Sequence, residues 1–550
     1  MALPGQGIPT VTELLLARGR DNSPGLLFSE QRWTWAEHVQ ECADRAALLR
    51  SLRRPGPFHI GVLLDNVPEF SFLLGGAALA GAVLVGLNTT RRGEALARDI
   101  RLAECQVVVT DSRYVELLDD LDLGAAQGRV LDIDTAAWHV SVFAHRDRPL
   151  EAVPAAPNDL LMLIFTSGTS GDPKAVRCTH GKIAHPGRML AQRYGLGPDD
   201  TVYVSMPMFH SNAIMAGWAV GLAAGATLAL RARFSASGFL TDVRRYGVTY
   251  ASYVGKPLSY ILATPRADDD ADNPLRLMFG NEASERDAAA FAERFGCEVD
   301  DAYGSTEGGI VLARPPGRPA GSIGKLGDGV AILDPRTERP CPPARFDEHG
   351  RLANPEEAVG ELVNTTGPRW FAGYYRDSAA DGQRIRNGMF WSGDLAYRDE
   401  QDFCYFYGRS EEWLRVDGEN LGTAPIERIL LRHPDIDQAV VYAVPDTAIG
   451  DQVMAAVVLR QGCRFDPDAF TRFLAAQPDL GPKQVPRFVR VATRLPRTPT
   501  HKVRGRTLAA QGWRCADPVW WREGRDKRFR PLTAEIAAIQ LDGGTRSVPG

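Results

Sequence analysis

The chain has 550 residues, 44% of them hydrophobic and 24% charged, and a formal net charge of -5. A chain of this length is too long for a single core, so we expect at least two globular domains. Charges of both signs are interspersed without a long basic stripe, which argues against nucleic acid as a main partner. The eight cysteines form no CxxC pair and no Cys/His cluster with metal-ligand spacing, which favours a reducing, cytoplasmic environment.

The first stretch, Met1–Asp21, lacks a basic region followed by an apolar core, so we expect neither a secretory signal nor a membrane anchor. From residue 26 to about 400, short β-rich runs alternate with Ala- and Leu-rich helical runs. This alternation predicts parallel sheets covered by helices. The main β-rich runs are residues 59–65, 107–111, 160–167, 201–207, 226–230 and 276–280.

Two stretches, Phe70–Leu87 and Ser205–Leu230, contain no acidic or basic side chain other than histidine and approach the length of a membrane span. Both are rich in Gly and Ala, and each has the pattern of a helix followed by a strand. We therefore predict buried elements of an α/β domain at both places.

Between these stretches, the run Thr166–Lys174 reads TSGTSGDPK. Glycines allow backbone N–H groups to approach a ligand, hydroxyls add donors and the lysine adds a charge, so the run is suited to a polyphosphate. It lacks the Walker A pattern, because Asp172 and Pro173 separate Gly171 from the lysine and the following residues favour a strand. A polar hairpin turn between two strands is the alternative.

A second unit is expected to begin near Tyr407, where the chain becomes charged and rich in turns. Residues 426–433 then favour a helix, and residues 437–445 and 451–460 favour strands of a compact α+β module. Lys502 follows in a Pro/Thr-rich loop.

Five motifs in order carry a resemblance to a known superfamily. They are TSGTSGDPK (166–174), MPMFH (206–210), DAYGSTEGG (301–309), WSGDLAYRD (391–399) followed by YGRSEEWLRVDGEN (407–420), and TPTHK (498–502). Over nearly its whole length the chain resembles the adenylate-forming, AMP-binding enzymes, which include acyl-CoA synthetases, luciferases and peptide-synthetase adenylation domains. It is most similar to the very-long-chain acyl-CoA synthetase and fatty-acid-transport-protein branch, although Lys256 stands where that branch usually has Glu.

The resemblance implies the α/β fold of this superfamily, the ANL type. A large N-terminal domain of parallel-rich sheets covered by helices, residues 1–408, would bind the nucleotide and the acyl group. A hinge at residues 409–412, centred on Glu411, would join it to a small, mobile α+β lid domain, residues 413–550.

The resemblance also implies a nucleotide site. Tyr303 would stack on adenine, for which a flat apolar face is required; a place in the ordinary core is the alternative for this residue. The remaining positions that the resemblance assigns to nucleotide or coenzyme A binding are Thr166, Ser167, Gly168, Thr169, Ser170, Gly171, Lys174, Gly280, Asn281, Glu282, Asp301, Ala302, Gly304, Ser305, Thr306, Asp394, Arg409, Gly418 and Glu419.

Thr306 and Glu307 are implied to be catalytic. Thr306 would bond the α-phosphate, and Glu307 would hold Mg²⁺, a hard cation that prefers oxygen ligands. A solvated surface carboxylate is the alternative for Glu307, but Gly308 and Gly309 directly after it favour close approach of the backbone to a ligand.

Near the end of the large domain, Asp394 would accept both ribose hydroxyls, and the alternative is a turn residue after Gly393. Arg409 would bind ribose or phosphate. For Glu411, a charged residue of a solvated linker is the alternative to a hinge.

His210 and Lys502 complete the catalytic set that the resemblance implies. His210 would lie where the acyl carboxylate enters, and a satisfied core or surface histidine is its alternative. Lys502 would neutralise the negative charge that develops on the α-phosphate under attack. Its alternative is a solvated lysine in a charged loop.

The implied activity is that of an AMP-forming fatty-acid–CoA ligase. A carboxylic acid and ATP would give acyl-AMP, and coenzyme A would then give the thioester, with Mg²⁺ as cofactor and a fatty acid or a steroid side-chain acid as substrate. The alternatives are an acyl-AMP ligase that loads a carrier protein, a light-emitting oxygenase and a non-catalytic lipid-uptake or binding protein. Peripheral membrane contact and homodimerisation are left open.

Overall fold

The computed structural model describes residues 7–146, 149–166, 173–312, 314–315, 317–409, 414–416, 419–446, 450–497, 503–522 and 528–533. Of residues 415, 419, 420, 446 and 450 it describes only the backbone. The chain divides into two compact units. The first comprises Met1–Val311, Gly367–Phe390 and Pro499–His501, and the second comprises Leu312–Thr366, Trp391–Thr498 and Lys502–Gly550.

One sheet of the first unit has seven strands in the order β13-β12-β11-β9-β10-β1-β2 among the described residues. All neighbours pair in parallel except β1 and β2, which are antiparallel. The strands are β1 Pro24–Phe28, β2 Gln31–Thr34, β9 Thr201–Val204, β10 Thr227–Leu230, β11 Tyr250–Val254, β12 Leu277–Asn281 and β13 Glu298–Asp301. Strands β9, β12 and β13 lead directly into predicted site motifs.

The other sheet of the first unit has the order β6-β5-β3-β4-β7-β8 in the described part of the chain. It is parallel as far as β7, and β8 joins the edge antiparallel. The strands are β3 His59–Leu63, β4 Val83–Gly86, β5 Cys105–Thr110, β6 Val130–Asp132, β7 Leu160–Thr166 and β8 Lys174–Thr179. The predicted parallel sheets are thus confirmed for this unit.

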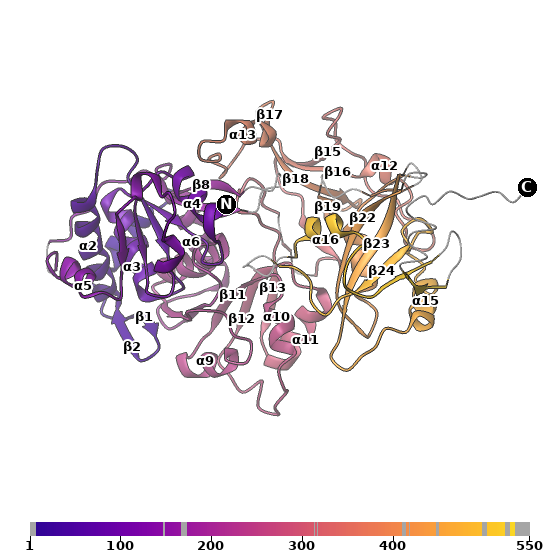
Figure 1. Cartoon of the computed structure of the whole chain (residues 1–550), viewed down its shortest axis with the longest axis horizontal. Helices are drawn as coiled ribbons and strands as arrows, with labels where there is room; N and C mark the ends of the chain where they lie inside the picture. Colours follow the sequence, from indigo (N-terminus) through magenta and orange to yellow (C-terminus); the bar gives the residue numbers. More distant parts are fainter. Residues whose placement is uncertain are drawn as a thin grey trace, which may run out of the picture. The chain divides into compact units, whose positions relative to one another are not determined.

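Helices surround the strands of the first unit (Figure 1). The ends of these helices follow local sequence rules. A capping box of Thr34 and Glu37 begins α2. Helix α3 begins at Pro68, and its C-terminal cap is Gly81, whose backbone is in the left-handed region. The helical elements are α1 Val11–Arg18, α2 Trp35–Leu52, α3 Pro68–Ala80, α4 Gly93–Leu102, η1 Val115–Leu118, η2 Gly124–Ala126, α5 Ala136–Phe143, α6 His180–Tyr194, α7 Ser211–Ala213, the π-helical turn η3 Ile214–Trp218, α8 Ala219–Ala224, α9 Phe239–Tyr246, α10 Pro257–Leu262, α11 Glu285–Phe295 and α13 Ser378–Arg384; the two-residue strand β17 Ile385–Arg386 follows α13.

The two long apolar stretches are buried elements, as predicted. The first forms α3 and β4, and the second forms α7, η3, α8 and β10. Every residue of α3 is buried. Among the described helices, none has the length and apolar character that crossing a membrane would require.

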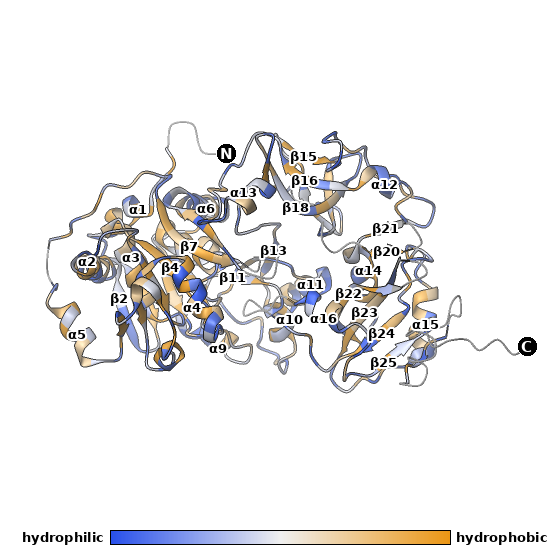
Figure 2. Cartoon of the chain, turned by 45° about the horizontal axis from the view of Figure 1, so that its top comes forward, coloured by the Kyte–Doolittle hydropathy of each residue, from blue (hydrophilic) through white to orange (hydrophobic). Residues whose placement is uncertain are grey.

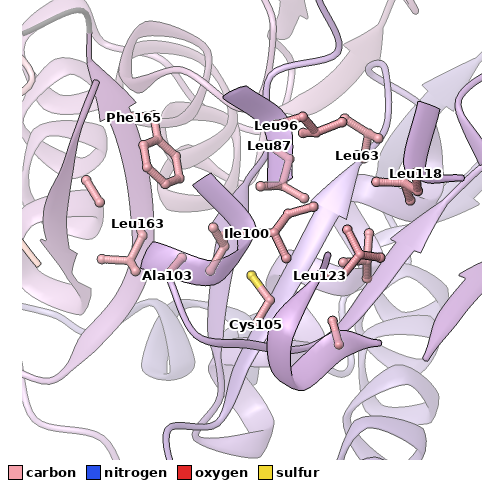
Figure 3. Packing of buried hydrophobic residues seen from close by; sticks show 14 of the residues in the cluster. Leu63, Leu87, Leu96, Ile100, Ala103, Cys105, Leu118, Leu123, Leu163 and Phe165 are labelled. Atoms are coloured by element: carbon pink, nitrogen blue, oxygen red, sulfur yellow. The ribbon is translucent and has the colours of Figure 1, made fainter. Parts of the chain in front are cut away.

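A hydrophobic cluster joins α4 to the strands beneath it. Figure 3 shows Leu96, Ile100 and Ala103 of the α4 segment facing Cys105 and Leu163 of the sheet, all of them buried. Figure 2 shows β4 and β7 as hydrophobic strands within the unit. Their continuous apolar sequence is what a parallel strand covered on both faces requires.

The first sheet of the second unit differs from the prediction. Its strands, in the order β14-β19-β18-β16-β15, pair antiparallel wherever the register is described. The expectation of parallel sheets up to about residue 400 is therefore wrong after β13. The turn Asp399–Asp402 joins β18 to β19 and leaves no room for the crossover helix that a parallel pair needs. The elements are β14 Ser322–Lys325, β15 Val330–Leu333, α12 Pro355–Ala358, β16 Gly360–Asn364, β18 Met389–Arg398 and β19 Phe403–Arg409.

The rest of the second unit contains the predicted α+β module. The helix expected at residues 426–433 is α14, and the two expected strands are β22 and β23. Residues 410–412 of the predicted hinge lie outside the described residues, so the hinge and the domain boundaries stay predictions. The elements are β20 Leu414–Val416, β21 Glu419–Leu421, α14 Thr423–Leu430, β22 Ile436–Asp446, β23 Gly450–Leu459, α15 Pro467–Ala475, β24 Phe488–Val491, α16 Gly505–Gln511, β25 Val519–Trp521 and β26 Arg530–Pro531.

Candidate functional site

The predicted site residues of the first unit gather at the carboxyl ends of parallel strands. His210 follows β9, Gly280 and Asn281 end β12, and the motif Asp301–Gly309 begins at the end of β13. Strands β9, β11, β12 and β13 are neighbours and parallel, so these ends share one edge of the sheet. Ligands of α/β proteins usually bind at this edge.

The residues predicted on the adenine side lie together on β12 and β13. Asp301 accepts hydrogen bonds from the Tyr253 hydroxyl at 2.7 Å and from the backbone N–H of Ala283 at 2.9 Å. The Ala302 N–H donates to the Gly280 carbonyl at 2.6 Å. A Cβ at Gly280 would collide with the Tyr253 backbone, which explains glycine at this position. Tyr303 is partly buried and is not a core residue.

Thr306 meets the segment that carries His210. The hydroxyls of Thr306 and Ser211 are hydrogen bonded at 2.9 Å. His210 directly precedes Ser211, and its ring lies 4.5 Å from that of Phe209. The structure therefore brings together the two segments that the resemblance assigns to the α-phosphate and the acyl carboxylate.

Glu307 is a partly buried, bonded carboxylate and not a solvated surface group. Its Oε1 accepts a hydrogen bond from the Tyr374 hydroxyl at 2.9 Å, and Nε of Arg384 donates to that hydroxyl at 3.4 Å. Burial acts to raise the pKa of the Glu307 carboxyl, but the charge of Arg384, a backbone N–H, Tyr374 and Lys182 together lower it. The group is held as an anion.

The glycines after Glu307 pack closely, as the motif suggests. Gly308 has φ +70°, and a Cβ there would lie 3.3 Å from Cβ of Trp370 and 3.5 Å from Cε of Lys182. A Cβ at Gly309 would collide with the ring of Phe390. These contacts are with protein atoms, so the predicted close approach of this backbone to a ligand stays a prediction.

Lys174 lies at the end of the loop that the sequence analysis singled out. Strands β7 and β8 pair antiparallel with Thr166 opposite Lys174, so the loop joins the two strands of a hairpin. Lys174 is buried, and its Nζ lies 5.3 Å from the centre of the Tyr374 ring. The same tyrosine thereby contacts Lys174 and Glu307. Ser167, Gly168, Thr169, Ser170 and Gly171 lie outside the described residues.

In the second unit, Asp394 and Arg409 form a pair. They stand opposite each other on β18 and β19, and Nε of Arg409 lies 3.6 Å from Oδ1 of Asp394. Asp394 is a strand residue, so the alternative of a plain turn residue does not apply. Glu419 is part of β21, while Glu411, Gly418 and Lys502 lie outside the described residues.

The sequence analysis did not identify Tyr374, Arg384, Ser211 or Lys182 as site residues. Tyr374 reaches the site because its segment runs beside β8, where it forms a bridge with Val176. Arg384 ends α13, and no motif marks either residue. Lys182 had one weak signal: lysine is rare in this chain, and Lys182 lies in the first turn of the helix that follows β8.

Two family models match the chain. The model described as AMP-binding enzyme matches residues 16–375, and the model described as AMP-binding enzyme C-terminal domain matches residues 425–502. Their order agrees with the large and small domains that the resemblance implies.

Full-length relatives and a solved structure extend the match. The chain is 53% identical over 513 residues to a medium/long-chain fatty-acid–CoA ligase of Mycobacterium marinum. The aligned region covers 93% of this chain and 98% of the relative. It is 49% identical to a steroid-22-oyl-CoA synthetase of Rhodococcus jostii, with 97% of each chain covered. The crystal structure of the anthranilate CoA ligase AuaEII with anthranoyl-AMP has a TM-score of 0.80 at 19% identity and covers 93% of this chain and 98% of its own. The chain therefore belongs to the family of AMP-binding enzymes, and its predicted place among the acyl-CoA synthetases is confirmed.

Proposed function

We propose that this protein is an AMP-forming ligase that joins a medium- or long-chain fatty acid to coenzyme A. The observation that carries the proposal is the arrangement of Thr306, Glu307, Tyr374 and Lys174 in the first unit. A hydroxyl, a carboxylate and a lysine there would supply the donor, the metal ligand and the cation that a triphosphate needs. The nearly full-length similarity to two CoA ligases supports it.

The reaction has two steps. In the first, the substrate carboxylate attacks the α-phosphorus of ATP, the bond to the β-phosphate oxygen breaks, and acyl-AMP and pyrophosphate form. In the second, the thiol of coenzyme A attacks the acyl carbonyl, AMP leaves and a thioester forms. Neither step requires a covalent enzyme nucleophile, so the residues act by positioning and charge.

In this proposal the side chains of the first unit hold the triphosphate. Thr306 donates to the α-phosphate, and Lys174 neutralises the more distant phosphates. Glu307 fits a Mg²⁺ ion, because it is an anionic oxygen ligand, and the Tyr374 hydroxyl that donates to its Oε1 orients the carboxylate. Bound there, Mg²⁺ would supply charge neutralisation on the phosphates, and its remaining ligands would be phosphate oxygens and water.

The second unit would bind the ribose, and a rotation within it would take the enzyme from the first step of the reaction to the second. Asp394 accepts from the ribose hydroxyls and Arg409 contacts ribose or phosphate. Lys502 stabilises the first transition state, and a rotation at Glu411 then brings the 417–422 segment, with Gly418 and Glu419, to the site for thioester formation. The resemblance supports these roles.

For Asp394 we expect that replacement by alanine raises the KM for ATP by roughly 10–100-fold, the effect of losing hydrogen bonds to a charged group. The change in kcat is expected to be small, because the ribose contacts are the same in substrate and transition state. Asp402→Ala serves as the matched control, since Asp402 forms a half-exposed ion pair with Arg398 on the same sheet. Equal KM values for ATP in both variants and the parent would contradict the ribose assignment.

The segment after His210 is the proposed acyl-binding element. Its π-helical turn is a feature that often occurs at functional sites. Ala213 and Ala216 are buried, and a Cβ at Gly217 would already contact Val204 and Ser252. The absence of a side chain at Gly217 therefore serves close packing within the first unit. The Rhodococcus jostii relative supports a steroid side-chain acid as the second candidate substrate.

Release of pyrophosphate across a panel of acids tests the proposal. We expect faster release with medium- and long-chain fatty acids or steroid side-chain acids than with benzoate. We also expect thiol consumption when coenzyme A is added. Pyrophosphate release without loss of free coenzyme A would instead identify a ligase that loads a carrier protein, and no release with any acid would support a binding protein.

Peripheral membrane contact, homodimerisation and a cytoplasmic location stay proposals. All eight cysteines are free thiols, as a reducing compartment favours. On α5, Val140 and Phe143 are 68% and 69% exposed, and α5 is one of the hydrophobic helices in Figure 2. Flotation with lipid vesicles would measure membrane contact, and light scattering would measure the oligomeric state.

A further inference from the structure

The segment that carries His210 leaves its sheet as buried, irregular backbone. Strand β9 ends at Val204, and the buried residues Met206, Met208 and Phe209 follow it. Backbone N–H and C=O groups that are buried without a partner cost free energy, and a chain that has left its strand no longer has the partners of the ladder. This segment therefore requires hydrogen-bond partners from elsewhere in the fold.

Asn66 supplies such partners through its side-chain amide. Its Nδ2 donates to the Met206 carbonyl at 2.8 Å and to the Val204 carbonyl at 3.4 Å. Its Oδ1 accepts from the Met208 N–H at 2.8 Å, while Pro207 has no N–H to donate. The amide thus pairs with the segment as the backbone of a neighbouring strand would, and Asn66 is only 2% exposed.

Asn66 is itself fixed in the connection between β3 and α3. Its backbone N–H donates to the Ala232 carbonyl at 3.2 Å. The preceding residue, Asp65, is buried and accepts from Nε of Arg233 at 2.7 Å and from the Tyr114 hydroxyl at 2.7 Å. A side chain anchored in this way can hold another segment in position, because its own movement is restricted.

Gly86, the last residue of β4, is in contact with the same segment. A Cβ at Gly86 would lie 3.0 Å from Cα of Phe209 and 3.0 Å from Cε of Met162, which is closer than ordinary packing allows. Two residues after Phe209, the Ser211 hydroxyl is hydrogen bonded to that of Thr306 at 2.9 Å. A shift of this backbone would therefore be transmitted to the predicted acyl and α-phosphate positions.

We propose that Asn66 is a positioning residue that holds the His210 segment against the Thr306 motif and thereby sets the place of the substrate carboxylate relative to the α-phosphate. The inference rests on the proposed function, in which the His210 segment receives the carboxylate and Thr306 binds the phosphate. Asn66 acts through the backbone that it holds and does not touch the acid. A misplacement of about 1 Å between reacting groups can lower a rate by about 10²-fold.

Asn66→Asp tests the inference by steady-state release of pyrophosphate. Aspartate keeps the shape of the side chain and the oxygen that accepts from Met208, but an ionised carboxylate cannot donate to the Met206 carbonyl. At saturating ATP, we expect kcat/KM for the acid to fall by about 100-fold. At saturating acid, the KM for ATP is expected to stay close to that of the parent, because the adenine-side residues lie on other strands.

Asn273→Asp is the matched control. Asn273 makes the same kind of bridge shortly before β12 begins, at the opposite edge of the sheet from the site. Its Nδ2 donates to the Asp270 carbonyl at 2.7 Å, and its Oδ1 accepts from the Leu275 N–H at 2.8 Å. This variant should lower the thermal stability and leave kcat/KM for the acid as in the parent. An effect of Asn66 on stability alone would make the two variants alike.

Gly86→Ala provides a second test if Asn66→Asp does not fold. The added methyl group would press on the Phe209 backbone, and the substitution removes no hydrogen-bonding group. We expect a smaller loss of kcat/KM for the acid in the same direction, again with a KM for ATP close to that of the parent. A folded Gly86→Ala enzyme with the kinetics of the parent would then count against the inference.

Equal kinetics of Asn66→Asp and Asn273→Asp would overturn the inference, and so would a KM for ATP that rises as much as the KM for the acid. The activity of the parent distinguishes the two levels of the argument. If the parent adenylates an acid and a folded Asn66→Asp enzyme does so equally well, only the role of Asn66 fails. If the parent adenylates no acid, the proposed function itself fails.

Discussion

Lys502→Ala is expected to slow acyl-AMP formation by about 10²–10³-fold, the effect of losing one preorganised donor to a developing charge. As the carboxylate adds to the α-phosphorus, negative charge accumulates on the equatorial oxygens, and a lysine in a site that excludes water neutralises it. The measurement is single-turnover release of pyrophosphate with saturating ATP and acid. Binding of ATP should change much less than the rate, because the charge develops only in the transition state.

The second half-reaction provides the control. Given synthetic acyl-AMP and coenzyme A, the Lys502→Ala enzyme should form thioester at close to the parent rate. Glu411→Pro should show the opposite pattern, because proline fixes φ at the proposed hinge and obstructs the rotation. Equal losses in both half-reactions for each variant, with unchanged circular dichroism, would contradict a mechanism with two domain positions.

Elements with a strong local pattern were predictable from the sequence. Apolar runs such as those of β7 and β9 are stable only when they are buried in a core. The same holds for the charge-free stretch that forms α3 and β4, so an α/β core was predictable for all of them. The ends of α2 and α3 follow from Thr34, Glu37 and Gly81. The motif residues Thr306 and Glu307 were predictable because a superfamily resemblance marks them.

Long-range contacts were not predictable in this way. The hydroxyl of Tyr374 reaches Glu307 across 67 residues of sequence, and no periodicity records which loop runs beside β8. The antiparallel sheet that begins with β14 was missed because its strands resemble other short β-runs. Of the neighbours in the order β14-β19-β18-β16-β15, only β18 and β19 are joined by a short turn, and the long connections before β16 and β18 carry helices, as crossovers between parallel strands do. Lys182 lies close to Gly308, and this proximity of residues far apart in sequence exists only in the folded chain.

Glu307→Gln should raise the Mg²⁺ concentration needed for half-maximal adenylation by about 100-fold, at the upper end of what changes around metal sites cost. Glutamine keeps the shape of the side chain and an oxygen that accepts from Tyr374, so the fold should survive. It removes the negative charge, and a neutral amide oxygen is a weaker ligand for a hard cation than a carboxylate. The measurement is the initial rate of pyrophosphate release at fixed ATP over a range of Mg²⁺.

A graded control makes this expectation specific to the metal. Tyr374→Phe removes only the hydroxyl that orients the carboxylate, and it should raise the Mg²⁺ requirement by about tenfold, less than the loss of the ligand itself. If Glu307 served only to join the 301–309 motif to the Tyr374 segment, both variants would lower thermal stability and leave the Mg²⁺ dependence alone. A larger Mg²⁺ effect in Tyr374→Phe than in Glu307→Gln would also contradict the assignment, because an orienting hydroxyl cannot matter more to the ion than the ligand it orients.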